Sequence, residues 1–286
     1  MLLLFRWLSR APLWLAHAIG IVLGWVAWLA SPTYRRRFRA NCVQAGLTDA
    51  QQHAAVAEAG KLVCELPRLW FGAPVPVQWR GVEHIEMALA QGQGLLMLTP
   101  HLGCFEVTAQ AYAQRFGAQS SGGLPKKPVN VLFRPPRQPG WRRVVESARE
   151  RPGLATAPTT LAGVKQLMQA LKNGEAVGLL PDQVPPLGMG VWAPFFGLRA
   201  YTMTLWARFA RMPNTVTLLL VGERLPRGAG YVVHVTPLLQ VVGEPIAETQ
   251  EAAAGQLNQA LEWMIRRRPE QYLWGYQRYK QPRKGH

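Results

Sequence analysis

Short apolar runs alternate with helix-forming segments through most of this chain, and this alternation restricts the fold more than any other sequence feature. The runs typical of buried strands are VQWRG, LLMLTP, VNVLFRP and AVGLLPDQ, each with a helical segment after it. Alternating strands and helices favour a mostly parallel central sheet that helices cover on its faces. The sequence therefore predicts an α/β fold, and its 286 residues are enough for one large core.

The remaining segments predict how the sheet is completed. Residues 41–72 suggest two helices, with Thr48-Asp49 as the N-cap of the second. Residues 184–197, rich in Pro, Gly and aromatic residues, are expected to form a loop before a helix near 202–211. Two later runs, TVTLLLVGERL and YVVHVTPLL, flank a turn and predict an antiparallel pair. A final helix is expected over residues 248–267.

The first 32 residues predict a membrane-anchor helix, with a separate catalytic domain over residues 33–286. Residues 11–30 carry no formal charge, and as a helix they are long enough to cross a bilayer. Two arginines precede this segment, and four follow it within residues 35–39. By the positive-inside rule, the larger cluster and the main domain should lie on the cytoplasmic side.

Two other interpretations of the apolar segment remain open. A cleaved signal peptide is disfavoured, because no convincing cleavage site follows and the cysteines do not suggest disulfides. A helix lying in the plane of the membrane is compatible with His17 and the neighbouring arginines. Membrane association is strongly favoured, and a full span is favoured over an in-plane helix.

The charge of the chain limits the classes of partner it is expected to bind, and its cysteines indicate the redox state of its compartment. The formal net charge is +16, yet 49% of residues are hydrophobic and 11 are Trp. Because the basic residues are interleaved with Trp, Leu and Pro, a membrane surface is favoured over nucleic acid. The three cysteines, Cys42, Cys64 and Cys104, form no CxxC pattern. This argues against a disulfide framework or a zinc site and indicates a reducing compartment.

Polar residues stand at the ends of three of the apolar runs. His101 follows LLMLTP and precedes Glu106 by five positions, Arg134 ends a second run, and Asp182-Gln183 end a third. The carboxyl ends of parallel strands face one crevice, so these residues are expected to form one site. We interpret His101 as a general base that takes a proton from a hydroxyl, because its ordinary pKa lies near neutrality.

The other site residues are given supporting roles. Glu106 is expected to hydrogen-bond the second ring nitrogen of His101 and fix its tautomer, or to stabilise the start of its helix. Arg134 is expected to clamp a phosphate or stabilise developing negative charge, with a surface salt bridge as the alternative. Asp182 and Gln183 are expected to orient a substrate or hold Arg134, and a purely structural role is nearly as well supported.

Two further features of the His101 segment bear on mechanism. The backbone N–H groups of residues 103–105, at a helix start, are candidates for binding an oxyanion or a phosphate. Cys104 offers a rival mechanism in which a thiolate attacks the substrate. Packing behind the helix start is the favoured interpretation of Cys104.

Over nearly its whole length the chain resembles the lipid A biosynthesis acyltransferases of the lysophospholipid acyltransferase superfamily. The resemblance rests on the apolar N-terminal segment, His101-x4-Glu106, LFRP, LPDQ, PFFGLRAYT and the closing YLW with Arg278 and Lys280. It implies acyl transfer from acyl carrier protein to a lipid hydroxyl at the cytoplasmic face of the inner membrane. It also implies no metal or organic cofactor.

These observations give one expected function and two alternatives. The expected function is transfer of a fatty acyl chain from acyl carrier protein to an anionic lipid A precursor. Val184-Pro185-Pro186 departs from the family pattern and leaves room for another acceptor, such as an ornithine lipid, a glycolipid or a polyene lipid. A basic, membrane-anchored binding protein without catalysis is the third possibility. Five aromatic residues are candidates for an acyl slot or for ordinary core: Trp70, Phe71, Trp192, Phe195 and Phe196.

Overall fold

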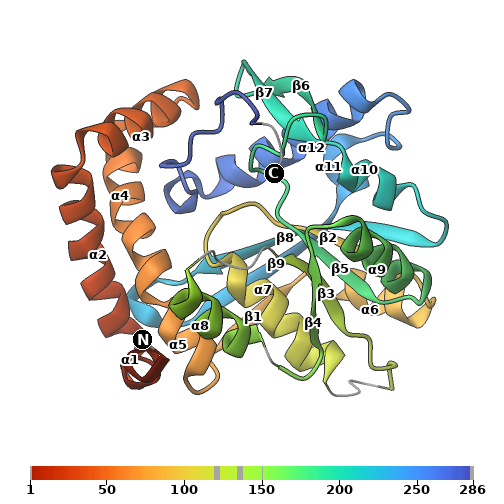
Figure 1. Ribbon diagram of the computed structural model, residues 1–286, viewed down its shortest axis with the longest axis horizontal. Helices are drawn as coiled ribbons and strands as arrows, with labels where there is room; N and C mark the ends of the chain where they lie inside the picture. Colours follow the sequence, from red (N-terminus) through yellow and green to blue (C-terminus); the bar gives the residue numbers. More distant parts are fainter. Residues whose placement is uncertain (1, 119–122, 134–137, 150, 284–286) are drawn as a thin grey trace.

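A seven-stranded sheet forms the centre of the computed structural model, which describes residues 2–118, 123–133, 138–149 and 151–283. The strand order is β1-β9-β8-β2-β5-β3-β4 (Figure 1). All neighbouring strands are parallel except β8 and β9. The strands are β1 (Val77–Arg80), β2 (Gly94–Leu98), β3 (Val129–Phe133), β4 (Leu154–Pro158), β5 (Ala176–Leu179), β8 (Thr215–Arg224) and β9 (Tyr231–Pro237). The predicted α/β class and the antiparallel pair are both confirmed.

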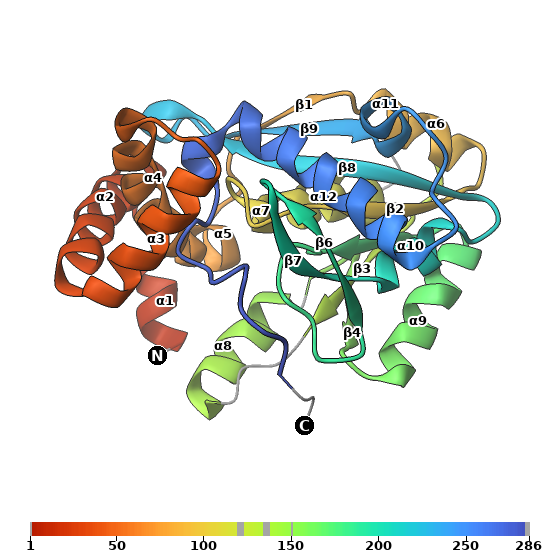
Figure 2. The same ribbon diagram turned by 90° about the horizontal axis from the view of Figure 1, so that it is seen from above.

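Helices cover both faces of this sheet, as Figure 2 shows. In β2, Leu95 and Met97 join the buried cluster beneath α6 (Glu83–Ala90), α7 (Phe105–Tyr112) and α8 (Pro139–Arg149). Leu96 and Leu98 join the opposite cluster, with α9 (Leu161–Lys172), α10 (Leu205–Ala210) and α12 (Gln250–Arg267). Successive side chains of a strand point to opposite faces, so a strand buried on both must be apolar throughout.

The N-terminal helices lie together at one end of the molecule (Figures 1 and 2). They are α1 (Leu2–Leu8), α2 (Leu13–Ala30), α3 (Pro32–Gln44), α4 (Asp49–Cys64) and α5 (Leu66–Phe71). A capping box between Thr48 and Gln51 starts α4, which confirms the predicted N-cap. Within the described residues, α2 alone is long and apolar enough to cross a membrane, and 33% of it is buried inside the protein.

Glycines allow α2 and α4 to approach each other closely. A Cβ atom at Gly60 would lie 1.9 Å from the carbonyl oxygen of Gly20, and one at Gly24 would lie 2.4 Å from that of Val56. Any larger residue would therefore push the two helices apart. The helix predicted as an anchor is thus packed against the rest of the chain along one of its faces.

The segment predicted as a loop at residues 184–197 instead contains strand β6 (Gly190–Phe195). It forms a separate hairpin with β7 (Leu198–Met203), which also takes the first residues of the helix expected at 202–211. The strand was not predicted because Pro194 lies within it, and a proline argues against a strand. Among the described residues β6 pairs with no strand except β7, so it is an edge strand, and an edge strand tolerates proline.

Smaller departures involve short elements. Strand β4 was not predicted, and it too is an edge strand that ends in proline. The helical segment predicted after LLMLTP is α-helical from Phe105 to Tyr112 and continues as a π-helical turn, η1 (Ala113–Gly117). The remaining elements are η2 (Pro226–Gly228), α11 (Leu238–Val242) and η3 (Pro269–Gln271).

Candidate active site

His101 and Asp182 meet at the carboxyl edge of the sheet. Strands β2 and β5 are parallel neighbours, and Leu98 pairs with Leu179 at their ends. His101 and Asp182 each stand three residues beyond these paired positions. Equal offsets from paired residues bring the two side chains together, so two of the three predicted polar points do converge.

The carboxylate of Asp182 holds His101 in two places. Its Oδ1 lies 2.8 Å from the ring Nδ1 of His101, and its Oδ2 accepts a 2.9 Å hydrogen bond from the backbone N–H. The Asp182 side chain is only 3% exposed. Burial alone would raise the pKa of this carboxyl group, but the charge and hydrogen bonds of His101 outweigh it and lower the pKa. An ionised Asp182 can only accept, so Nδ1 carries the proton.

The second ring nitrogen of His101, Nε2, therefore carries no proton and can accept one. The side-chain nitrogen of Gln183 lies 3.1 Å from Nε2 and donates to it. Burial tends to lower the pKa of His101, but the Asp182 charge and hydrogen bond, together with the Glu106 charge, raise it above its ordinary value. The arrangement supplies a basic nitrogen whose tautomer is fixed, as proton transfer requires.

Glu106 does not occupy the position that the sequence predicted. Its carboxylate accepts hydrogen bonds from Arg149, at 3.1 Å, and from the indole N–H of Trp70, at 3.4 Å. The predicted hydrogen bond to the second nitrogen of His101 is therefore wrong, because Asp182 already occupies Nδ1. Glu106 is on the first turn of α7 and bonds side chains of α5 and α8 instead. It acts on His101 through its charge.

The backbone donors predicted for an oxyanion are largely occupied. The N–H of Gly103 donates to the carbonyl of Gln271, and the N–H of Cys104 donates to the carbonyl of Gly222. Gly103 has a φ of +59°, and a Cβ there would lie 2.2 Å from the Gly222 oxygen, so glycine is required. This correction follows from a long-range contact between the loop and β8, which the local sequence does not reveal.

The thiol of Cys104 is unsuited to nucleophilic attack. Its side chain is fully buried, and burial together with the nearby charge of Glu65 raises its pKa well above the ordinary value. A protonated, inaccessible thiol is a poor nucleophile. The packing interpretation of Cys104 is therefore supported.

Arg134 lies outside the described residues. The third predicted polar point is consequently not placed, and its role stays a prediction. Gln183, by contrast, contacts the histidine itself, whereas the sequence suggested contact with a substrate or with Arg134.

A buried ion-pair network lies behind the loop that carries His101. The guanidinium of Arg224 donates to Glu65 at 2.7 and 2.8 Å, to Glu58 at 2.6 Å and to the carbonyl of Gly103 at 3.2 Å. Glu65 also accepts from the Tyr231 hydroxyl and lies 3.0 Å from His17. Burial opposes ionisation of Glu65, but Arg224 lowers its pKa to about 2. No local sequence pattern predicts this network, because its members are far apart in the chain.

The closing aromatic segment packs on the domain. Tyr272 and Trp274 are buried, and the N–H of Leu273 donates to the carbonyl of His101. Arg278 is also buried and donates to the carbonyl of Tyr201 and the hydroxyl of Thr202. The segment thus supports the His101 loop through the backbone of Leu273.

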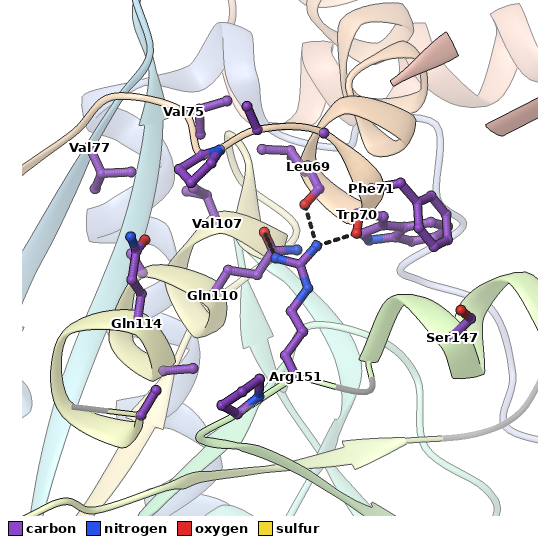
Figure 3. Close-up of a pocket in the computed structure, with 17 residues that line it drawn as sticks. Leu69, Trp70, Phe71, Val75, Val77, Val107, Gln110, Gln114, Ser147 and Arg151 are labelled. Carbon is purple, nitrogen blue, oxygen red and sulfur yellow. Dashed lines mark hydrogen bonds between the residues drawn. The ribbon is translucent and has the colours of Figure 1, made fainter. Parts of the chain in front are cut away.

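A cavity of about 430 Å³ lies between α5, α7 and α8 (Figure 3). Trp70 and Phe71 line it, as does Val107, the residue after Glu106. Arg151 also lines it and donates to the carbonyls of Leu69 and Trp70, as the dashed lines show. Of the five aromatic residues considered for an acyl slot, Trp70 and Phe71 face this cavity. Phe195 and Phe196 lie in the core, and Trp192 packs on Tyr201.

Known proteins with similar sequences point to one family. The profile described as "Bacterial lipid A biosynthesis acyltransferase" matches residues 52–281, a range that contains every candidate site residue. The lipid A biosynthesis lauroyltransferase of Escherichia coli K12 is 30% identical over 202 residues, or 70% of this chain and 60% of that protein. The lipid A biosynthesis palmitoleoyltransferase of the same organism is 27% identical over 226 residues, or 77% and 68%. The chain thus covers less than two thirds of the lauroyltransferase.

Proposed function

The chain belongs to the bacterial lipid A biosynthesis acyltransferase family, and from this premise we propose that it transfers a fatty acyl chain from acyl carrier protein to a hydroxyl of a lipid A precursor. The observation that carries the proposal is His101, whose Nδ1 is held by Asp182 while Nε2 keeps its lone pair. The lauroyltransferase and palmitoleoyltransferase similarities support the same reaction class.

In the proposed reaction, the acceptor hydroxyl displaces the Gln183 amide from Nε2 of His101 and gives its proton to that nitrogen. The hydroxyl oxygen attacks the thioester carbonyl, and a new C–O bond forms. Collapse of the tetrahedral intermediate breaks the C–S bond, and the imidazolium returns the proton to the leaving thiolate. Asp182 stabilises the imidazolium between the two transfers, since it faces the protonated ring at 2.8 Å.

Glu106 is proposed to act as a second charge near the imidazolium. Its hydrogen bonds to Arg149 and Trp70 keep its carboxylate in place, and its charge adds to that of Asp182 in favouring protonated His101. Arg134 remains our candidate for binding a phosphate of the acceptor or stabilising the tetrahedral intermediate. Both functions suit a guanidinium, which presents several donors in a plane.

The cavity beside Trp70 is our candidate for the acyl chain. It has mostly apolar walls, and its volume of about 430 Å³ is in the range of small-molecule sites. Trp70 links the cavity to the site, because it is one of the residues that line the cavity and its indole N–H bonds Glu106.

The charge of the protein suits the proposed partners and location. Acyl carrier protein and phosphorylated lipids are acidic, and a net charge of +16 favours encounter with both. We place the enzyme at the inner membrane with its catalytic domain on the cytoplasmic side, where the four arginines after α2 would meet anionic lipid headgroups.

Membranes containing the protein, incubated with acyl carrier protein that bears a labelled acyl chain and with an underacylated lipid A precursor, test the proposal directly. We expect labelled lipid A from the wild type and none from His101→Ala. Absence of transfer by the wild type would reject the lipid A assignment. Lipid profiling with and without the protein would then look for ornithine lipid, glycolipid or polyene lipid products.

The same assay separates catalysis from simple binding. A basic binding protein would keep its cellular effect when Glu106→Ala or His101→Ala is introduced at normal protein levels. Loss of the effect in either folded variant supports an enzyme.

A further inference from the structure

A large apolar surface covers α1 and one side of α2. More than half of the exposed large apolar side chains in the described residues lie between Leu3 and Leu29. Trp7 is 67% exposed, Val22 is 61% exposed and Leu29 is 61% exposed. An apolar surface of this extent on a folded protein marks a contact with a partner or a membrane.

The opposite side of α2 is docked on α4 along its whole length. His17 bonds Glu65 near the start of α2, Gly20 and Gly24 meet Gly60 at the middle, and Trp25 contacts His53 near the end. The β8–β9 turn adds a further contact, because Gly228 packs on the backbone of Trp14. The helix is therefore part of the folded domain.

Polar and charged groups lie beside the middle of α2 on this docked side. Lys61 is next to Gly20 and pairs with Glu58, which also pairs with the buried Arg224 of the central sheet. If α2 crossed a bilayer in this arrangement, these charges would enter the hydrocarbon, where a charge costs about 3 kcal/mol or more. If α2 left α4 to cross alone, the buried Glu65 would lose its bond to His17. Neither route preserves this fold.

Basic residues stand before and after the apolar face of α2. Arg6 on α1 and Arg10 just before α2 are exposed. At the other end, Arg35 and Arg39 stack over the Trp28 ring at 5.3 and 4.8 Å. Arginines and tryptophans around an apolar helix face are typical of helices that lie in the headgroup region of anionic membranes.

We propose that α1 and α2 lie flat in one leaflet of an anionic bilayer, with the docked face toward the protein and the apolar face toward the lipid. The helix that the sequence favours as a membrane span then does not cross. This inference concerns how the protein meets the membrane and does not depend on acyl transfer.

Labelling of the two ends of α2 tests the orientation. Arg10→Cys, Thr33→Cys and the domain reporter Gln78→Cys are made singly in a Cys64→Ser background, because Cys42 and Cys104 are fully buried. Inner-membrane vesicles of both orientations are treated with a membrane-impermeant maleimide. We expect all three positions to react from one and the same side. Reaction of residues 10 and 33 from opposite sides would overturn the proposal.

Binding of the purified full-length protein to vesicles tests the surface itself. Val26→Glu changes a residue that is 53% exposed on α2, and Met87→Glu changes one that is 55% exposed on α6 as the matched control. We expect Val26→Glu to reduce flotation with phosphatidylglycerol-containing vesicles at least tenfold and Met87→Glu to leave it unchanged. Wild-type binding should be weaker on phosphatidylcholine alone.

The same proteins distinguish a second occupant of the surface. One outcome would show that a second copy of the chain covers this face and that the proposal is wrong. In that outcome the wild type forms a dimer without lipid, Val26→Glu dissociates this dimer, and Val26→Glu and Met87→Glu float equally well with vesicles. No acyl donor is present in these assays, so failure of the proposed enzymatic activity would not affect them.

Discussion

His101 takes its partner from a neighbouring strand. The sequence made Glu106 the natural choice, because it is close in the chain and on the adjoining helix. Asp182 is 81 residues away, yet it reaches both the ring and the backbone N–H of His101. Two hydrogen bonds from one buried carboxylate fix the ring more firmly than a single contact would. The charge of Glu106 then has a lesser, supporting effect.

The rate of acyl transfer should depend on the protonation of His101. Because its pKa is raised, we expect kcat/KM to fall as the pH drops through a value above 6.5, since only neutral imidazole accepts the hydroxyl proton. Measuring kcat/KM for the acyl carrier at several pH values, with the acceptor lipid at a saturating concentration, checks this. A profile that stays flat down to pH values near 5 would argue against His101 as the base.

Asp182→Asn should weaken both the position and the basicity of His101. We expect kcat to fall about 10²–10⁴-fold, the usual contribution of a positioned base, and the acidic limb of the pH profile to move to lower pH. The shift follows because the charge that raises the His101 pKa is gone while burial, which lowers it, remains.

Glu106→Gln is the control for Asp182→Asn. The Glu106 carboxylate makes no hydrogen bond to His101 and acts on it through its charge alone. Removing that charge should therefore shift the pH profile less than Asp182→Asn does. Equal shifts in the two variants would contradict the assignment of Asp182 as the orienting partner.

At the scale of elements, close helix contact and buried charge tie the N-terminal helices to the sheet. Glycines bring α2 onto α4, and Arg224 at the end of β8 bonds two glutamates of the α4 region. The same guanidinium bonds the loop before α7. A change in the position of α4 should therefore move the His101 loop through the side chain of Arg224.

Gly60→Ala should destabilise the protein. The added Cβ would overlap the Gly20 carbonyl, so we expect a loss of about 1–3 kcal/mol, as for other overpacked sites. Gly255→Ala on α12 is the control, because a Cβ there meets nothing within 4 Å. Alanine should stabilise that helix by about 0.5–1 kcal/mol. Denaturant unfolding in detergent measures both, and equal effects would refute the close α2–α4 contact.

Arg224→Met should be more damaging than the loss of an exposed ion pair. It leaves Glu65 buried without its main partner, and breaking a buried pair costs about 3–5 kcal/mol. The Arg224→Met/Glu65→Gln double variant should recover part of that loss. Unfolding curves of the single and double variants give the coupling, and full additivity would contradict a direct interaction.

At the scale of the whole molecule, positive charge and an apolar face suit the chain to an interface between water and lipid. Its net charge of +16 is spread over a fold whose α1 and α2 present apolar side chains outward. Helix α1 also packs on α5 and α8, which border the cavity. The proposed acyl slot is thus beside the proposed membrane surface.

Acyl transfer from acyl carrier protein should weaken with salt. Long-range attraction between a basic enzyme and an acidic carrier is screened as the Debye length shrinks. We expect kcat/KM for the carrier to fall at least several-fold when ionic strength rises from about 0.05 M to about 0.5 M, while kcat changes little. Steady-state rates at several salt concentrations check this, and a salt-independent kcat/KM would exclude electrostatic steering.

The sequence by itself determined the strands that are buried on both faces, the capped start of α4, the apolar α2 and the positions of His101 and Asp182 at strand ends. These depend on local patterns of polarity and on single capping residues, which can be read along the chain. Tertiary structure alone decided that Asp182 and not Glu106 bonds His101, that Gln271 and β8 occupy the Gly103 and Cys104 donors, and that Arg224 meets Glu65. Each of these depends on which strands and helices pack side by side, and that packing joins residues that the chain separates widely.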